Sequence, residues 1–168
     1  MELVKSRYSV RSFSNEEVSQ DLLDKIIEAG MVAPTACNIQ PQRIYVIRSK
    51  EGLAKIDALT HCRYGAPVMF LFAYNTDEVW KNPKEAGIVS GQQDVSIVAT
   101  HMMFEATDLG LGTLWIDLFP NAEAEKAFGL SLNEKAVLLM ALGYASPDAK
   151  PSGNHTKKRP VSELIRYL

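Results

Sequence analysis

Two runs of eight largely apolar residues limit what this chain can fold into more than any other feature of its sequence. They cover residues 66–73 and 136–143. Each run is far shorter than the ~20 apolar residues that a helix needs to cross a bilayer. Apolar runs of this length without polar alternation are typical of strands buried on both faces of a sheet. We therefore predict two buried strands, and we place residues 68–74 at the centre of the sheet.

Helical patterns surround these runs. Ser14 and Glu17 have the spacing of a capping box, which predicts a helix N-cap at Ser14 and a helix that ends near Met31. Residues 86–109 carry apolar side chains on more than one face of a long helix, so this helix should lie inside the domain or at a subunit interface. We also expect short helices at 50–59 and 122–128, strands at 44–47 and 113–116, and an irregular tail from residue 144 closed by a short helix or strand.

The chain of 168 residues shows no internal repeat or linker, so we expect one domain over residues 1–168. With 18 basic and 20 acidic residues the formal net charge is −2, which gives no overall field to attract nucleic acid or an anionic membrane. Residues 1–5 lack the pattern of a signal peptide, and we expect a cytoplasmic protein.

Several familiar motifs are absent or fail in context. Cys37 and Cys62 stand 25 residues apart with no Cys-x-x-Cys pair, which argues against disulfides, zinc and iron–sulfur clusters. The three histidines, His61, His101 and His155, do not pair at metal-ligand spacing, and each is interpreted as structural or as a surface residue. The glycines at 110 and 112 follow a helix and precede a strand, the reverse of a dinucleotide-binding loop, so they are interpreted as a helix end and turn.

Two basic clusters lie at opposite ends of the chain. Residues 7–11 read Arg-Tyr-Ser-Val-Arg, and residues 157–159 read Lys-Lys-Arg. The guanidinium group presents a planar fork of donors that matches phosphate oxygens and stays charged at any working pH. If both clusters bind one dianion, they join the N-terminus to the tail. The alternative is that both are ordinary solvated surface.

Residues 33–42 form a loop of small side chains and carboxamides. Small residues permit the close approach of a flat ring, and Asn38 and Gln40 offer donor and acceptor atoms that suit the polar edge of a heterocycle. Cys37 has no visible neighbouring base, so a filler role is favoured over a nucleophile.

Four segments together resemble the nitroreductase family of FMN-dependent oxidoreductases. Each segment is weak alone, but their order and spacing are specific, and the resemblance covers nearly the whole chain, which would be one of the shorter members. The segments are Arg-x-Ser-x-Arg at 7–11, Ala-Pro-Thr-Ala-x-Asn-x-Gln-Pro at 33–41, Leu-Gly-Leu-Gly-Thr-x-Trp-Ile at 109–116 and Lys-x-Arg-Pro at 157–160.

The resemblance implies an α+β fold with a mixed sheet of four or five strands flanked by helices. It implies a homodimer that exchanges arms and holds two FMN molecules at its interface. The residues that would hold the phosphate and ribityl chain come from the basic clusters: Arg7, Tyr8, Ser9, Arg11, Lys157 and Arg159. Those that would pack on the isoalloxazine come from the partner's loop: Pro34, Thr35, Ala36, Asn38 and Gln40. Those that would line its other face are Trp115, Ile116, Asp117 and Leu118.

The implied activity takes hydride from NAD(P)H and passes it, in a ping-pong cycle, to nitroaromatic, quinone or related acceptors. The absence of a catalytic acid, nucleophile or metal site fits, because the cofactor supplies the redox chemistry. One alternative is a flavin-binding protein without rapid turnover. Another is a specialised relative that cleaves flavin or removes halogen, although the stretch from residue 62 to 84 is short for the lid that such enzymes need.

Two residues depart from the family pattern. Arg43 stands where relatives often carry an aromatic residue, so it would alter ring packing or face solvent. Asp117 stands where many short relatives carry glycine. A carboxylate beside the ring would oppose negative charge on reduced flavin, so we expect the Asp117 side chain to point away or to contact substrate.

Overall fold

A four-stranded antiparallel sheet forms the centre of the protein. The computed structural model describes residues 1–168. The strands are β1 (Gln42–Ile47), β2 (Val68–Asn75), β3 (Gly112–Ile116) and β4 (Glu134–Gly143), in the spatial order β1-β2-β4-β3. The two apolar runs are β2 and β4, which lie at the centre as predicted. The remaining predicted strands are also present, each longer by one or two residues.

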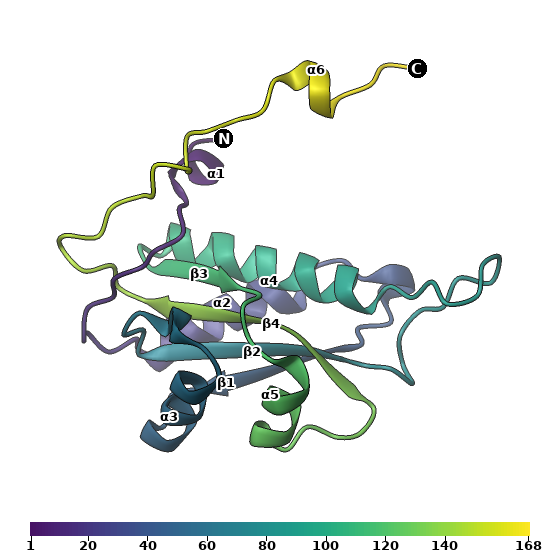
Figure 1. Ribbon diagram of the computed structural model, residues 1–168, viewed down its shortest axis with the longest axis horizontal. Helices are drawn as coiled ribbons and strands as arrows, with labels where there is room; N and C mark the ends of the chain where they lie inside the picture. Colours follow the sequence, from purple (N-terminus) through teal and green to yellow (C-terminus); the bar gives the residue numbers. More distant parts are fainter.

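Helices cover both faces of this sheet (Figure 1). One layer contains α2 (Gln20–Met31) and α4 (Gly91–Asp108), and the other contains α3 (Lys50–Leu59) and α5 (Asn121–Phe128). Successive side chains of a strand point to opposite faces, so β2 divides its side chains between two cores. Phe70 and Phe72 pack in the core under α2 and α4, whereas Met69 and Leu71 pack in the core under α3 and α5. This three-layer arrangement explains why β2 has no polar alternation.

Four short elements complete the fold, two of them near the chain ends and two in loops of the interior. These are α1 (Glu2–Ser6), α6 (Val161–Leu164) and two 3-10 turns, η1 (Ala36–Asn38) and η2 (His61–Arg63). The tail leaves the body after β4, passes near α1 and projects away from the other elements (Figure 1). An irregular tail closed by a short helix or strand was predicted, and α6 shows that the closing element is a helix. No helix is both long enough and apolar enough to cross a membrane.

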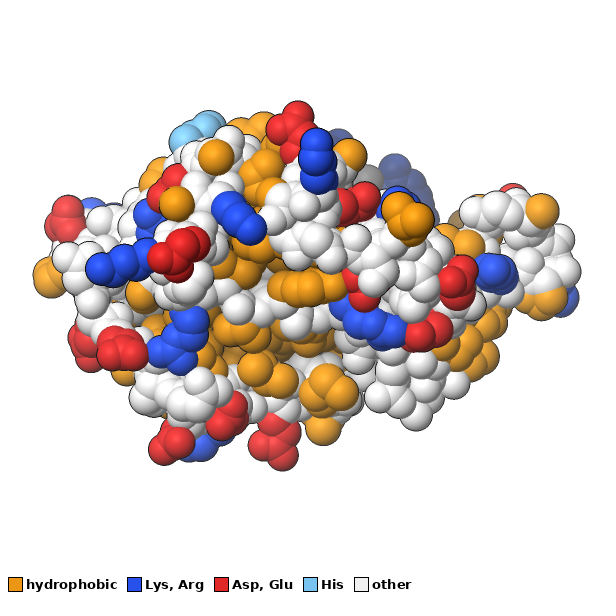
Figure 2. All heavy atoms as spheres, turned by 90° about the horizontal axis from the view of Figure 1, so that it is seen from below, with side chains coloured by type: hydrophobic (Ala, Val, Ile, Leu, Met, Phe, Trp, Pro, Cys, Tyr) orange, Lys and Arg blue, Asp and Glu red, His pale blue; other side chains and the backbone are white.

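Charges of both signs are interspersed on the face that carries α3 and α5. Figure 2 views the protein from this side and shows basic and acidic side chains among hydrophobic ones. No large area of one sign covers this face.

The predicted start of the first long helix is wrong. Helix α2 begins at Gln20, and its N-cap is Ser19, whose hydroxyl accepts a hydrogen bond from the Leu22 N–H at 3.4 Å. Ser14 instead donates its backbone N–H to the Tyr144 carbonyl at 2.9 Å. Residues around Ser14 are therefore held by a tertiary contact with the end of β4, which overrides the local capping-box spacing.

The predicted start of the long helix at residue 86 is also wrong. Helix α4 begins at Gly91, and residues 76–90 form an excursion away from the body (Figure 1). Gly87 has φ of 87°, and an antiparallel bridge joins Lys81 to Val89. This turn places residues 86–90 outside the helix although their side chains continue its apolar pattern.

The α+β class and the four strands flanked by helices agree with the expected fold, but the strand pairs are all antiparallel rather than mixed. β2 and β3 run in the same direction, and β4 lies between them and pairs antiparallel with both. The one parallel pairing is an isolated bridge between Ser9 and Thr113.

Candidate functional site

The N-terminal basic segment is fixed along the outer edge of β3. Ser9 forms its bridge with Thr113, and the Val10 N–H donates to the Thr113 carbonyl at 2.9 Å. Val10 is buried against Gly112, where a Cβ atom would lie only 2.6 Å from the Val10 side chain. The missing Cβ of Gly112 therefore permits the segment to approach the strand closely.

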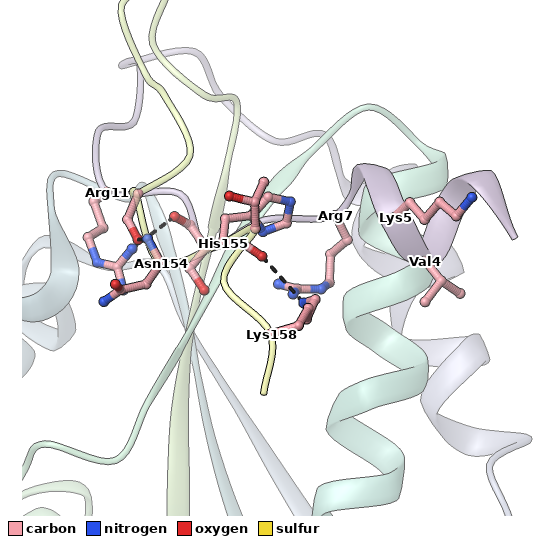
Figure 3. Close-up of a pocket in the computed structure, with 10 residues that line it drawn as sticks. Val4, Lys5, Arg7, Arg11, Asn154, His155 and Lys158 are labelled. Carbon is pink, nitrogen blue, oxygen red and sulfur yellow. Dashed lines mark hydrogen bonds between the residues drawn. The ribbon is translucent and has the colours of Figure 1, made fainter. Parts of the chain in front are cut away.

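The tail crosses the same segment. Ser146 donates its N–H to the Ser12 carbonyl at 3.0 Å, and the hydroxyl groups of the two serines are 2.6 Å apart. Farther along, the rings of Tyr8 and His155 meet edge to face with centroids 6.3 Å apart. These contacts bring residues 152–158 opposite Arg7 and Arg11 (Figure 3).

A cavity of about 670 Å³ opens between these segments. Its lining contains basic and polar side chains, one apolar side chain and no carboxylate: Lys5, Arg7, Ser9, Arg11, Ser152, Asn154, His155, Thr156, Lys158 and the apolar Val4. Arg7, Arg11 and Lys158 form no ion pair, and Lys5 makes only an exposed 3.8 Å pair with Glu2.

Hydrogen bonds inside the cavity leave most of its donors available. Arg11 donates to the Ser9 carbonyl at 3.3 Å, and Lys158 donates to the His155 carbonyl at 3.4 Å (Figure 3). Neighbouring cations without a counter-charge repel one another, and an anion with several oxygen acceptors relieves that repulsion. The donor set therefore fits a phosphate group.

The structure brings together some of the predicted phosphate-binding residues and separates others. Arg7, Ser9 and Arg11 line the cavity, and the Tyr8 ring packs against His155 beside it. Lys157 and Arg159 do not line it, and Arg159 instead pairs with Glu163 at 2.7 Å.

Lys158 belongs to the predicted basic cluster but was not among the residues expected to hold the phosphate, and neither was His155. Lys158 takes the place expected of its two neighbours, because the turn of the tail sends adjacent side chains in different directions. His155 was interpreted as structural or as a surface residue, yet it lines the cavity. The sequence feature that could have pointed to His155 is its position two residues before the basic cluster at 157–159.

The loop at residues 34–40 has an unusual backbone. Cys37, Asn38 and Gln40 have φ of 51°, 54° and 57°, in the left-handed region that most side chains avoid. The hydroxyl of Thr35 accepts the Gln40 N–H at 3.1 Å, and the Thr35 carbonyl accepts the Asn38 N–H at 2.9 Å. The side chains of Pro34, Asn38 and Gln40 remain exposed, so they are free to contact a ligand or a partner.

This loop and the cavity lie at opposite ends of α4. Ala36 donates its N–H to Asp94, near the first turn of the helix, at 2.8 Å. Leu3 of α1, next to the cavity, lies against the last turns of α4 beside Asp108. At a rise of 1.5 Å per residue the helix spans roughly 21 Å between Asp94 and Asp108. One chain does not bring the loop and the cavity together.

Residues 115–118 continue β3 beyond the bridge that fixes Ser9. Ile116 is buried, whereas Asp117 and Leu118 are exposed. The Trp115 indole N–H donates to the Asp117 carboxylate at 2.9 Å. The Asp117 side chain is thus drawn back toward its own strand.

Arg43 belongs to an ion-pair network at the base of the excursion. Its guanidinium binds both Glu78 oxygens at 2.7 Å, and its Nε lies 3.6 Å from Glu134. Tyr45 donates its hydroxyl to Glu134 at 2.5 Å. Burial and this hydrogen bond raise the pKa of Tyr45 to about 12. The Arg43 side chain is therefore engaged by two carboxylates, although it remains 33% exposed.

The sequence model of the nitroreductase family matches residues 4–64 and 62–144 of this chain. The chain belongs to the nitroreductase family. A nitroreductase family protein from Clostridium difficile 630 has a solved structure that is similar over 99% of this chain and 96% of its own, with 35% identity and a TM-score of 0.92.

Two further proteins are similar to this chain. A solved structure from Desulfovibrio desulfuricans, provisionally described as a nitroreductase in complex with FMN, is 25% identical over 99% of this chain and 95% of its own, with a TM-score of 0.82. A protein of Archaeoglobus fulgidus, provisionally named NADH dehydrogenase/NAD(P)H nitroreductase, is 28% identical over 150 residues, which are 86% of this chain and 84% of the relative.

Proposed function

We propose that this nitroreductase family member is an FMN-dependent oxidoreductase. It takes hydride from NAD(P)H and passes it, in a ping-pong cycle, to nitroaromatic, quinone or related acceptors. The observation that carries the proposal is the cavity that joins Arg7 and Arg11 to Lys158, more than 140 residues away, without any carboxylate in its lining. The FMN complex of the Desulfovibrio neighbour and the name of the Archaeoglobus relative support the same cofactor and electron donor.

Arg7, Ser9, Arg11 and Lys158 would hold the phosphate group of FMN. The two guanidinium groups present paired donors and Lys158 adds a point charge, so the cavity distinguishes a phosphate ester from the free hydroxyl of riboflavin. When bound, FMN supplies the transfer of electrons between the nicotinamide and the acceptor. The protein's own tasks are to bind the phosphate, to orient the ring and to limit its exposure to water.

Residues 115–118 would lie along one face of the ring. β3 leads from the bridge at Ser9 toward these residues, so a ligand anchored in the cavity can extend in their direction. Trp115 and Leu118 offer partly exposed apolar surface, and the backbone N–H groups after Ile116 are outside the strand ladder. The hydrogen bond from Trp115 holds the Asp117 carboxylate, which reduces its effect on negative charge that develops on the ring.

A homodimer would complete each site. The loop at 34–40 lies at the end of α4 away from the cavity, so Pro34, Thr35, Ala36, Asn38 and Gln40 would serve the cofactor of the partner subunit. Exposed apolar side chains agree with a partner: they include Val32 just after α2, Ile97 on α4, and Val161, Leu164 and Tyr167 on the projecting tail. An arm with that much exposed apolar surface gains stability when a second subunit covers it. The cytoplasmic location stays a prediction.

The visible absorption spectrum of the purified protein tests the proposal. Flavin bands that bleach after anaerobic addition of NADH or NADPH are the expected result, and reoxidation by a quinone or nitroaromatic compound completes the cycle. Bands that stay oxidised on the timescale of turnover would favour a flavin carrier. A colourless protein that does not take up added FMN would contradict the proposal.

A further inference from the structure

Asp94 is a buried carboxylate that no ion pair neutralises. The residue is only 2% exposed and lies near the start of α4. One of its oxygens accepts the Ala36 N–H at 2.8 Å, and the other accepts the Ser90 hydroxyl at 2.6 Å. Burial of a charge is costly unless donors satisfy it. The two donors and the positive end of the α4 dipole meet this need.

The bond from Ala36 is the one hydrogen bond that ties residues 34–40 to the rest of the protein. The other hydrogen bonds of these residues stay within the loop, because the N–H groups of Asn38, Ile39 and Gln40 bind Thr35 or Ala36. The Gln40 carboxamide likewise binds the Asn38 carbonyl at 3.3 Å. The position of the loop relative to α4 therefore depends on Asp94.

The loop also needs such a support because its backbone is strained. Cys37, Asn38 and Gln40 adopt positive φ within four residues. Left-handed conformations of this kind persist where surrounding contacts hold them, and they are common where a segment is shaped in advance for a ligand. Thr35 and Ala36 are half-buried and the other loop residues are exposed, so packing supplies only part of this support.

We infer that Asp94 is a positioning residue that holds the loop at 34–40 in the shape that receives the flavin ring. The inference rests on the proposed function, because it assumes that the loop contacts the ring. Asp94 acts through the Ala36 N–H and touches no cofactor itself. Its bond to Ser90 directs the second carboxylate oxygen and joins the loop to the end of the 76–90 excursion.

Binding of FMN and of riboflavin to the full-length protein tests the inference. Both ligands carry the ring, but only FMN carries the phosphate. Loss of the hydrogen bond in Asp94→Ala should lower the affinity for both ligands by the same factor, about tenfold or more, because hydrogen bonds to charged groups are stronger than those between neutral groups. Arg11→Ala should lower the affinity for FMN and leave the affinity for riboflavin unchanged. Asp94→Asn keeps an acceptor for Ala36, so it should restore most of the affinity.

Two measurements separate positioning from a general loss of structure. The visible circular dichroism of bound FMN reports the surroundings of the ring and should change in Asp94→Ala, while the far-ultraviolet spectrum should not. Asp21→Ala is the matched control, because Asp21 is an exposed helical aspartate without a hydrogen-bond partner. If Asp94→Ala does not fold, Ser90→Ala removes only one of the two bonds and should give a smaller loss, again equal for both ligands.

The outcomes are distinct. An equal loss of affinity for FMN and riboflavin in Asp94→Ala, with most of the affinity restored in Asp94→Asn, supports the inference. Unchanged affinity in a folded Asp94→Ala protein, or a loss confined to FMN, would overturn it while leaving the proposed function intact. If the wild-type protein binds neither ligand, the proposed function fails and the inference fails with it.

Discussion

Arg11 lines the cavity with its guanidinium group and has no carboxylate partner. Its only hydrogen bond is to a backbone carbonyl two residues away, so its charge is available to a ligand. Arg48 provides a contrast within the same chain, because its guanidinium is already engaged by Glu17 and Gln20. The free arginine fits a binding role and the paired one fits a structural role.

Removal of the Arg11 side chain should weaken FMN binding by about one to two powers of ten, since a hydrogen bond to a charged group contributes roughly 1.5–3 kcal/mol. Fluorescence titration of the apoprotein with FMN measures this change. Arg48→Ala is the control and should bind FMN like the wild type. FMN retention by Arg11→Ala equal to that of the wild type would contradict the phosphate role.

Tyr45 should make the protein sensitive to alkali. Burial, and then the hydrogen bond to Glu134, raise its pKa from 10.0 to about 12, so the folded state holds the phenolic proton more tightly than the unfolded state. The resulting stabilisation is complete below pH 10 and is lost as the pH rises toward 12. In Tyr45→Phe the urea midpoint should therefore fall less steeply across this interval than in the wild type. Urea midpoints that fall equally with pH in the two proteins would show that Tyr45 does not cause the loss of stability in alkali.

At the scale of elements, the contact between the N-terminal segment and β3 sets the geometry of the cavity. Gly112 permits it, because its hydrogen atom occupies the place where a larger side chain would meet Val10. The strand edge then aligns Ser9 with Thr113 and leaves Arg7 and Arg11 facing the tail. A disturbance at Gly112 should therefore affect both stability and phosphate binding.

Gly112→Ala should lower the free energy of unfolding by about 1–3 kcal/mol, the usual cost of an added group in a packed site. It should also weaken FMN binding by displacing residues 7–11. Urea unfolding and FMN titration measure the two effects. Gly153→Ala is the control for stability, because no atom lies near its hypothetical Cβ and its φ is not positive. Stability equal to that of this control, with FMN binding equal to that of the wild type, would show that the segment adapts without cost.

At the scale of the whole molecule, the tail runs from the cavity to the proposed dimer interface. Five tail residues line the cavity, namely Ser152, Asn154, His155, Thr156 and Lys158, and the apolar residues beyond them project into solvent. Surface of this kind that only a second subunit can cover makes the stability of a folded subunit depend on assembly. The tail should thus contribute to cofactor binding and to the dimer at once.

Truncation after Asn154 should cost the protein both FMN and the dimer. The truncated chain lacks His155 and Lys158 of the cavity, together with the apolar residues of α6 and the segment beyond it. Sedimentation velocity and the visible spectrum measure the two losses on the same sample. A truncated protein that stays yellow and dimeric would show that the tail has neither role.

The sequence by itself determined the two central strands, because an unbroken apolar run reports burial on both faces without reference to the rest of the chain. It also indicated the nitroreductase family, through the order and spacing of four short motifs, and the roles proposed for residues 7–11, through the chemistry of their side chains. Only the tertiary structure decided that α2 starts at Gln20, that Lys158 and His155 line the cavity, and that Asp94 supports the loop. Each of these depends on hydrogen bonds or side-chain directions that join segments far apart in the chain, and spacing along the sequence does not record such contacts.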